Sequence, residues 1–161
     1  MSQHIYTAEI IWRAEGDFEK GKYSRSHLWR FDGGVEVPAS ASPQVVPLPY
    51  SLAEAVDPEE AFVAAISSCH MMTFLDLARR AGLSIAAYED KAEGIMERLA
   101  RGRFAVTRAI LRPKITFRAT QHPDADQLAA LHEEAHEVCF IANSVKTEIE
   151  VEPMPALLVS P

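Results

Sequence analysis

The sequence is poor in cysteine and in basic side chains. Only two cysteines occur among 161 residues, and 16 Lys and Arg stand against 23 Asp and Glu. The net charge of −7, without a cluster of cations, argues against a nucleic-acid partner, because binding to a phosphate backbone needs grouped cations. Two cysteines without signs of secretion favour redox-active or buried thiols over a permanent structural disulfide.

Long hydrophobic runs are also missing. The N-terminal segment MSQHIYTAEIIW has no basic stretch followed by an apolar one, so no secretory signal is expected. We find no window of about twenty apolar residues, which predicts that no segment spans a membrane. A cytoplasmic location is therefore expected. The apolar share of 48% in a chain of this length predicts a single domain over 1–161 with its own core.

The spacing of apolar residues predicts an α+β fold with the element order βββ-α-ββ-α-β. The predicted strands cover 5–13, 22–31, 35–38, 85–99, 103–118 and 144–152, and the predicted helices cover 57–82 and 124–139. Residues 39–57, which are rich in proline and small side chains, form a predicted long loop. Loops of this length are often functional or clamped in an assembly.

The first predicted helix has clear start and end signals. Asp57 is a capping residue, Pro58 suits the first helical position, two glutamates follow, and Gly82 ends the helix. Its middle, AFVAAISSCHMMTFLDLA, is apolar around most of its circumference. We therefore expect the helix to be buried on nearly all sides, either by a sheet or by a second subunit.

Two segments around the cysteines resemble one known family. DPEEAFVAAISSCHMMTFL (57–75) resembles the first cysteine helix of the OsmC and organic hydroperoxide resistance proteins, and Glu59 precedes Cys69 by the ten residues typical there. AHEVCFIANSVKTEIEV (135–151) resembles their second cysteine helix, and the cysteine separation of 139 − 69 = 70 residues is close to the family pattern. The resemblance implies an OsmC-like fold, in which antiparallel sheets wrap around central buried helices and two chains form an intertwined homodimer.

The sequence departs from the family pattern at three places. Residues 140–143 (Phe-Ile-Ala-Asn) follow the second cysteine, where a proline and then a serine are common. His70 stands where an aromatic residue is common, and the loop 39–57 is long. These departures bear on the peroxide and the reductant more than on the fold, and they indicate a side branch of the family.

The resemblance implies a thiol peroxidase that acts on organic hydroperoxides without a cofactor. Cys69 would become a sulfenic acid, Cys139 would resolve it as a disulfide, and a small dithiol or lipoyl-type molecule would reduce that disulfide. From the residues alone, each cysteine is equally well explained as a small buried hydrophobe. A non-enzymatic dimer that binds a hydrophobic ligand therefore remains an alternative.

A thiolate at Cys69 needs a fixed cation nearby. This residue lies about three turns into its helix, where the helix dipole no longer helps and burial opposes ionisation. Arg25 is the candidate, with Arg30 and Arg13 as rivals and a solvated strand arginine as the alternative. Glu59 is expected to orient the arginine. Because Glu59 and Cys69 are about 15 Å apart along the helix axis, we expect Glu59 to act across a dimer interface; otherwise it is a helix-start charge.

Two further groups of residues have a functional and a structural interpretation. Phe62, Met72, Phe140 and the loop 47–50 are candidates for an apolar substrate pocket, although core positions explain such residues more simply. His132-Glu133-Glu134-Ala135-His136 matches the HExxH zinc motif, and Cys139 falls on the same helix face. The motif has only three fixed letters, so two histidines on the solvent face of an amphipathic helix are the preferred interpretation, and no metal site is predicted.

Overall fold

A computed structural model describes residues 3–161 of the chain. In chain order the elements are β1 (Ala8–Ile11), β2 (Gly16–Asp17), β3 (Lys22–Tyr23), β4 (His27–Phe31), β5 (Glu36–Ala39), α1 (Pro58–Arg80), β6 (Ile85–Asp90), β7 (Glu93–Ala100), β8 (Arg103–Leu111), β9 (Pro113–Arg118), α2 (Ala125–Val138), the 3₁₀ turn η1 (Ala142–Ser144), β10 (Glu148–Val151) and β11 (Leu157–Val159). The chain separates into two compact units, Met1–Ala61 and Phe62–Pro161. A single domain stays a prediction.

The first unit contains two small antiparallel sheets. β4 pairs with β1 on one side and β5 on the other, and β2 pairs with β3. The predicted single strand over 22–31 is wrong, because the chain leaves the β2–β3 pair after Tyr23 and enters the other sheet at His27. Arg25 therefore lies in the connecting segment and not in the middle of a strand.

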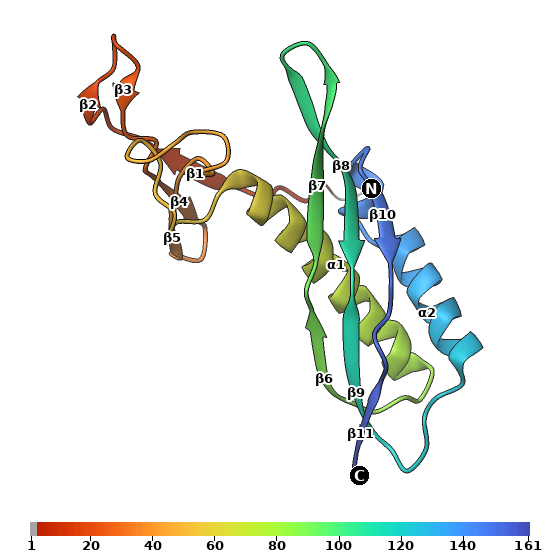
Figure 1. Cartoon of the computed structure of the whole chain (residues 1–161). Coiled ribbons are helices and arrows are strands. Elements are labelled where there is room, and N and C mark those ends of the chain that lie inside the picture. The colour runs from red at the N-terminus through yellow and green to blue at the C-terminus, as the bar shows by residue number, and fades with distance from the viewer. Residues whose placement is uncertain (1–2) are drawn as a thin grey trace. The chain divides into compact units, whose positions relative to one another are not determined.

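The second unit is built on two three-stranded sheets, with the strand orders β10-β8-β7 and β11-β9-β6. The two long strands predicted over 85–99 and 103–118 each break once. Figure 1 shows that each segment passes from one sheet to the other. The breaks are tied together, since the backbone N–H of Arg112 donates to Asp90 at 2.6 Å.

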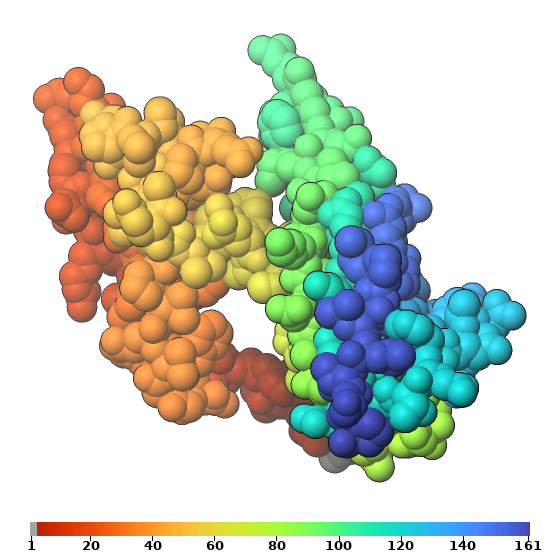
Figure 2. All heavy atoms as spheres, turned by 60° about the horizontal axis from the view of Figure 1, so that its bottom comes forward, coloured from red at the N-terminus to blue at the C-terminus, as the bar shows by residue number. Residues whose placement is uncertain are grey.

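One edge of each sheet in the second unit is parallel. β10 pairs with β8 and β11 pairs with β9 in parallel, while the other pairs are antiparallel. The sheets are therefore mixed rather than purely antiparallel. The sequence prediction missed β11, the dark blue C-terminal segment that lies beside the teal β9 segment (Figure 2). Its length of three residues leaves too little alternation to reveal a strand.

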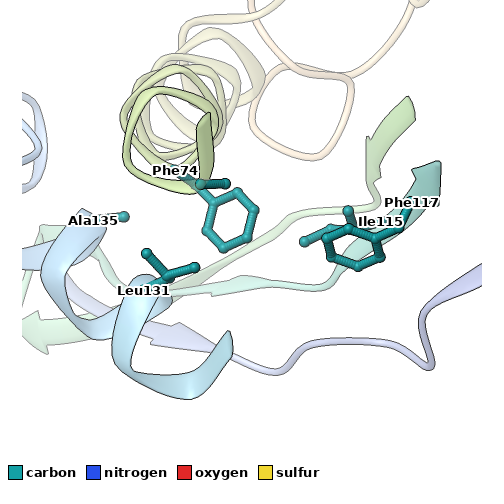
Figure 3. Close-up of a cluster of buried hydrophobic side chains, with 6 residues drawn as sticks. Phe74, Ile115, Phe117, Leu131 and Ala135 are labelled. Carbon is teal, nitrogen blue, oxygen red and sulfur yellow. The ribbon is translucent and has the colours of Figure 1, made fainter. Parts of the chain in front are cut away.

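The main core of the second unit lies where α1, α2 and β9 meet (Figure 3). Phe74 of α1 points between Leu131 of α2 and the β9 pair Ile115 and Phe117. A buried phenylalanine side chain contributes on the order of 3 kcal/mol to folding. This contact holds α2 against α1, and the cysteines sit on these two helices.

The start of α1 follows the sequence prediction. Asp57 Oδ1 accepts a hydrogen bond from the Glu60 N–H at 2.8 Å, and Glu60 Oε2 accepts one from the Asp57 N–H at 3.2 Å. This reciprocal pair is a capping box, which satisfies N–H groups that a helix start otherwise leaves without partners. Glu60 is thereby explained as a structural residue, and Glu59 is left out of the cap.

The burial of α1 differs from the prediction. Within one chain only a stripe at every fourth residue is buried, formed by Ile66, His70, Phe74 and Ala78. On another face Ala65, Ser68 and Met72 are exposed. The expectation of burial on nearly all sides is therefore wrong for a single chain.

The expectation that no segment is apolar and long enough to span a membrane is also wrong for α1. The helix passes such a test by length and composition, with a mean hydropathy of 1.5 over its most apolar window. The core helix of a globular protein passes the same test, and the buried stripe of α1 packs against α2 and the strands. Within one chain, 22% of that apolar window is buried.

Candidate dithiol site

The structure brings the two cysteines together within the second unit. Cys69 lies in the middle of α1, and Cys139 follows the last residue of α2. Their Sγ atoms are 2.7 Å apart, and both are free thiols. A disulfide bond measures about 2.05 Å, so a two-electron oxidation can join the two sulfurs with only a small movement of either side chain.

The two thiols have different surroundings. Cys139 is 1% exposed, whereas Cys69 is half-buried. Burial raises the pKa of the Cys139 thiol, and its hydrogen bond to Cys69 raises the pKa further, against a smaller lowering by the Ala142 N–H at 3.5 Å. Cys139 therefore keeps its proton and donates it toward Cys69 Sγ. The accessible, proton-accepting sulfur of Cys69 is the better placed of the two to attack a substrate.

The position of Cys139 is fixed by the turn that follows α2. The side-chain amide of Asn143 donates to the carbonyls of Glu137 at 2.7 Å and Cys139 at 3.0 Å, and the Ser144 hydroxyl donates to the Phe140 carbonyl at 2.6 Å. These bonds satisfy carbonyl groups that a helix end leaves free. Sequence reasoning missed the role of Asn143; an asparagine shortly after the end of the helical pattern was the available signal.

Arg25 is held within the first unit by its own neighbours. Its Nη1 donates to the Tyr23 carbonyl at 2.5 Å and to the Gly21 carbonyl at 3.4 Å, and the guanidinium stacks 3.7 Å above the Tyr23 ring. It lines a pocket of about 400 Å³. The other lining residues, mostly apolar or aromatic, are Ile10, Trp12, Phe18, Tyr23, His27, Ser40, Ala41 and Pro58.

The backbone of Arg25 is anchored as well. Its N–H donates to the Tyr50 carbonyl at 2.9 Å, and the His27 ring contacts its carbonyl through Nδ1 at 2.8 Å. Trp29 Nε1 lies 2.9 Å from His27 Nε2. Because an indole N–H only donates, His27 Nε2 is the acceptor and its Nδ1 carries the proton donated to Arg25. The segment that presents the guanidinium is therefore ordered by the His27 side chain of β4 and by a backbone carbonyl of the proline-rich loop.

Among the rival arginines and Glu59, Arg30 alone forms ion pairs in the described residues. Arg30 Nη1 lies 2.9 Å from Glu9 and its Nε lies 2.7 Å from Glu36, on the two neighbouring strands. The hydrogen bond to Glu36, followed by the charges of Glu9 and Glu36, raises the pKa of Arg30. This is a cross-strand ion pair. Within residues 3–161, Glu59 and Arg13 have no ion pair or hydrogen-bonded side-chain partner, so the expected pair of Arg25 and Glu59 is not formed in the chain.

The sequence predicted that the histidines of the HExxH-like segment lie on the solvent face of α2. This prediction is wrong for His132. His132 is 4% exposed, and its Nδ1 is 3.1 Å from Nε2 of the equally buried His70. His132 lies on the buried face of α2, where it faces α1 together with Leu131 and Ala135. Over residues 3–161, no three His, Cys, Asp or Glu side chains are grouped to hold a metal ion.

The pocket expected from sequence is formed by other residues. Phe62 packs against the buried Ile66, Ala109 and Leu111, which is the core position that sequence reasoning preferred. Met72 is 59% exposed and Phe140 is 80% exposed. The pocket beside Arg25 instead uses aromatic side chains of the N-terminal strands. The period-two pattern at Tyr23, Arg25 and His27 was present in the sequence but does not by itself predict a cavity.

The profile of the OsmC-like protein family matches residues 51–154, a range that contains both cysteines. The chain belongs to this family. Its structure is similar to that of an OsmC-like protein of unknown function from Vibrio cholerae, with 46% sequence identity, a TM-score of 0.89, and coverage of 96% of this chain and 100% of the other. The family resemblance read from two segments is confirmed, as is the α+β OsmC-like fold class.

More distant members of the OsmC-like family share the fold. An organic hydroperoxide resistance protein from Elizabethkingia anophelis has 19% identity and a TM-score of 0.66, covering 99% of this chain and 100% of its own. One from Legionella pneumophila has 18% identity and a TM-score of 0.61, covering 98% and 100%. No curated protein sequence matches the chain. The homodimer stays a prediction.

Proposed function

We propose that this OsmC-like protein is a thiol peroxidase that reduces organic hydroperoxides, with Cys69 as nucleophile and Cys139 as resolving thiol. The observation that carries the proposal is the 2.7 Å separation of two free thiols that are 70 residues apart in sequence. The family and the two organic hydroperoxide resistance proteins that share the fold support a peroxide-related redox role.

The proposed reaction has two steps in the protein. The Cys69 thiolate attacks the terminal oxygen of the hydroperoxide, the O–O bond breaks, and the departing alkoxide takes a proton to become an alcohol. The Cys139 thiol then attacks the sulfenic sulfur, an S–S bond forms, and water leaves. A small dithiol or lipoyl-type reductant returns both cysteines to thiols and becomes a disulfide itself.

Arg25 is proposed to assist the first step. Its side-chain hydrogen bonds within residues 3–161 use Nη1 alone, which leaves the other N–H groups of the guanidinium without a protein partner beside an apolar pocket. Unpaired donors are costly beside apolar surface, so an oxygen of a bound ligand is a favourable partner for them. Aromatic walls favour a carbon-bearing hydroperoxide over hydrogen peroxide.

A homodimer is proposed to complete the site, with Glu59 acting across the interface. The exposed small and apolar positions Ala65, Ser68 and Met72 on α1 support a partner chain, and Glu59 has no partner within its own described chain. Mixing inactive Glu59→Ala protein with inactive Cys69→Ser protein tests this. Activity returns after subunit exchange if the glutamate acts in trans, and the mixture stays inactive if it acts in its own chain.

Peroxide consumption with a small dithiol reductant tests the proposed activity. We expect turnover of cumene hydroperoxide to exceed that of hydrogen peroxide by roughly tenfold or more, since the apolar pocket binds only the former. Cys139→Ser should allow one oxidation of Cys69 and then stall as the sulfenic acid or over-oxidise. A protein that consumes neither peroxide would instead be a hydrophobic-ligand binder with inert cysteines.

A further inference from the structure

The imidazoles of His70 and His132 meet in the buried interface between α1 and α2. Nε2 of His70 and Nδ1 of His132 are 3.1 Å apart, and the two rings are nearly parallel, with an interplanar angle of 4°. Their exposed fractions are 2% and 4%. One ring must donate and the other accept, because a neutral imidazole has one nitrogen of each kind.

The histidine pair lies close in sequence to the sulfur pair on both helices. His70 follows Cys69 directly, and His132 precedes Cys139 by seven residues, which is about two turns or 10.5 Å along one helix face. In residues 3–161, two side-chain hydrogen bonds join α1 to the segment from α2 to Cys139, one between the imidazoles and one between the thiols. The imidazole contact is therefore the polar link between the helices that is not itself reactive.

Two side chains of α1 contact His132. His132 contacts His70 through the hydrogen bond and stacks on Phe74 with ring centroids 4.2 Å apart and an interplanar angle of 21°. His70 and Phe74 are one turn apart on the buried stripe of α1. The hydrogen bond and the stacking contact together restrain the position of the His132 ring relative to α1.

A hydrogen bond between buried groups specifies one register, which an apolar contact does not. Leucine or phenylalanine side chains tolerate small slips, because dispersion contacts have little directionality. A slip of α2 by one residue, about 1.5 Å, breaks the imidazole hydrogen bond and leaves two buried polar atoms without partners. Such atoms destabilise the slipped arrangement, because they have lost hydration without gaining a hydrogen bond.

We propose that His70 and His132 are positioning residues that hold α2 in the register at which Cys139 meets Cys69. The consequence for function rests on the proposed peroxidase chemistry: correct register makes disulfide formation faster than further oxidation of the Cys69 sulfenic acid. The positioning itself concerns the thiol pair and applies to any oxidant.

The imidazoles are poorly suited to a different role as bases. The pKa of each is lowered to about 4, mainly by burial; the charge of His136 also lowers that of His70 against the opposite effect of Asp90, and the charge of His70 also lowers that of His132. Both rings are therefore neutral and weakly basic near neutral pH. Their contribution comes from geometry rather than from proton transfer.

The variants are chosen to separate hydrogen bonding from packing. His70→Leu/His132→Phe removes both polar groups, and the new phenyl ring can keep the stacking on Phe74. In His132→Asn the amide reaches the place of Nδ1, whereas in His132→Gln it reaches the place of Nε2. His136→Leu is the matched control, because the buried Nδ1 of His136 has no hydrogen-bond partner in residues 3–161.

The first measurement is the equilibrium between the protein dithiol and glutathione disulfide, which needs no peroxide. Two protein thiols lose two electrons and two protons, and one glutathione disulfide becomes two thiols. We expect the double variant and His132→Gln to form the Cys69–Cys139 disulfide at least about tenfold less favourably. His132→Asn and His136→Leu should stay within about twofold of the wild type.

The second measurement follows the reaction with cumene hydroperoxide, using a sulfenic-acid trap and mass spectrometry. We expect the double variant to form the Cys69 sulfenic acid at the wild-type rate and to convert it to the disulfide at least about tenfold more slowly. A protein without peroxidase activity leaves the glutathione result intact, so the two proposals fail separately.

Wild-type glutathione equilibria in folded double-variant and His132→Gln proteins would overturn the positioning role. The role would also be overturned if the loss of disulfide formation simply followed each variant's free energy of unfolding and His132→Asn showed the same loss as His132→Gln. If circular dichroism shows the double variant to be unfolded, the comparison of His132→Asn with His132→Gln decides alone.

Discussion

The dithiol site of the second unit and the arginine pocket of the first unit are built in different ways. Cys69 and Cys139 meet between two helices that share an apolar core, and their sulfurs already contact each other. Arg25 lies in a connecting segment and is held by carbonyls, an aromatic ring and the adjoining loop. The thiol pair is complete without the arginine, so both reactions should need the two cysteines, whereas only peroxide reduction should need Arg25.

The largest effect is expected for the nucleophile. Cys69→Ser should abolish peroxide turnover, because a hydroxyl at this position is far less nucleophilic than a thiolate. Cys139→Ser should oxidise once and then accumulate a sulfenic acid or more highly oxidised species. Peroxide consumption and intact-protein mass measure both variants. Normal turnover by Cys69→Ser would show that the nucleophile is wrongly assigned.

The next effect separates the two regions. Arg25→Ala should slow oxidation of Cys69 by about a hundredfold, by analogy with loss of one charged donor to a developing anion, while the glutathione equilibrium of the dithiol stays unchanged. Arg25→Lys should restore only part of the rate, because the forked donor geometry is lost. Stopped-flow oxidation by an alkyl hydroperoxide measures the rate.

Arg30→Ala is the matched control, since Arg30 pairs with Glu9 and Glu36 on the strand surface. It should leave the oxidation rate near that of the wild type. If instead Arg30→Ala is slow and Arg25→Ala is normal, the role passes to Arg30.

The histidine pair predicts a pH effect that belongs to the second unit. The pKa of His70 and of His132 is lowered to about 4 by burial, so the unfolded chain binds more protons than the folded chain between pH 4 and 6.5. Stability from these residues is fully present above about pH 6.5 and is lost as the pH falls toward 4. His136 and Asp90 are the charged groups whose effects oppose each other at His70.

Urea unfolding between pH 4 and 7 measures this effect. The wild type should lose up to about 3 kcal/mol per imidazole across that range. The His70→Leu/His132→Phe variant should show a much flatter profile, because it lacks both titrating groups. An equally steep profile in this variant would assign the loss to other residues.

The smallest effect concerns packing between α1 and β7. A Cβ at Gly94 would come within 2.5 Å of Val63 Cγ2, so Gly94→Ala should lower the free energy of unfolding by about 2 kcal/mol through overpacking. Gly33→Ala is the control, because nothing lies within 4 Å of the added carbon. Equal stability of the two variants in urea unfolding would show that α1 can move away from β7.

The sequence predicted the two helices well, because their start and end signals are local and strong. The redox roles of the two cysteines stay a prediction. The Asp57 cap, the Pro58 start and the Gly82 end place α1 within a few residues, and the family spacing identifies Cys69 and Cys139. The interruption of 22–31 was not predicted, because the period-two alternation of Tyr23, His27 and Trp29 continues across the break at residues 24–26.

The histidine pair was also beyond sequence reasoning. His132 is polar by type, and its burial depends on a partner 62 residues away. A helical pattern assigns a face by hydrophobicity alone, so a polar residue that is satisfied by a distant partner is placed on the solvent side. The HExxH match drew attention to the correct residue for a reason unrelated to its contacts.

The most direct test of the thiol mechanism is mass spectrometry of the reduced protein before and after one equivalent of cumene hydroperoxide, with free thiols counted by alkylation. The account predicts a mass loss of two hydrogen atoms, no alkylated cysteine, and a peptide in which Cys69 is joined to Cys139. Two thiols that remain alkylatable, or a stable adduct of one oxygen atom without a disulfide, would contradict it.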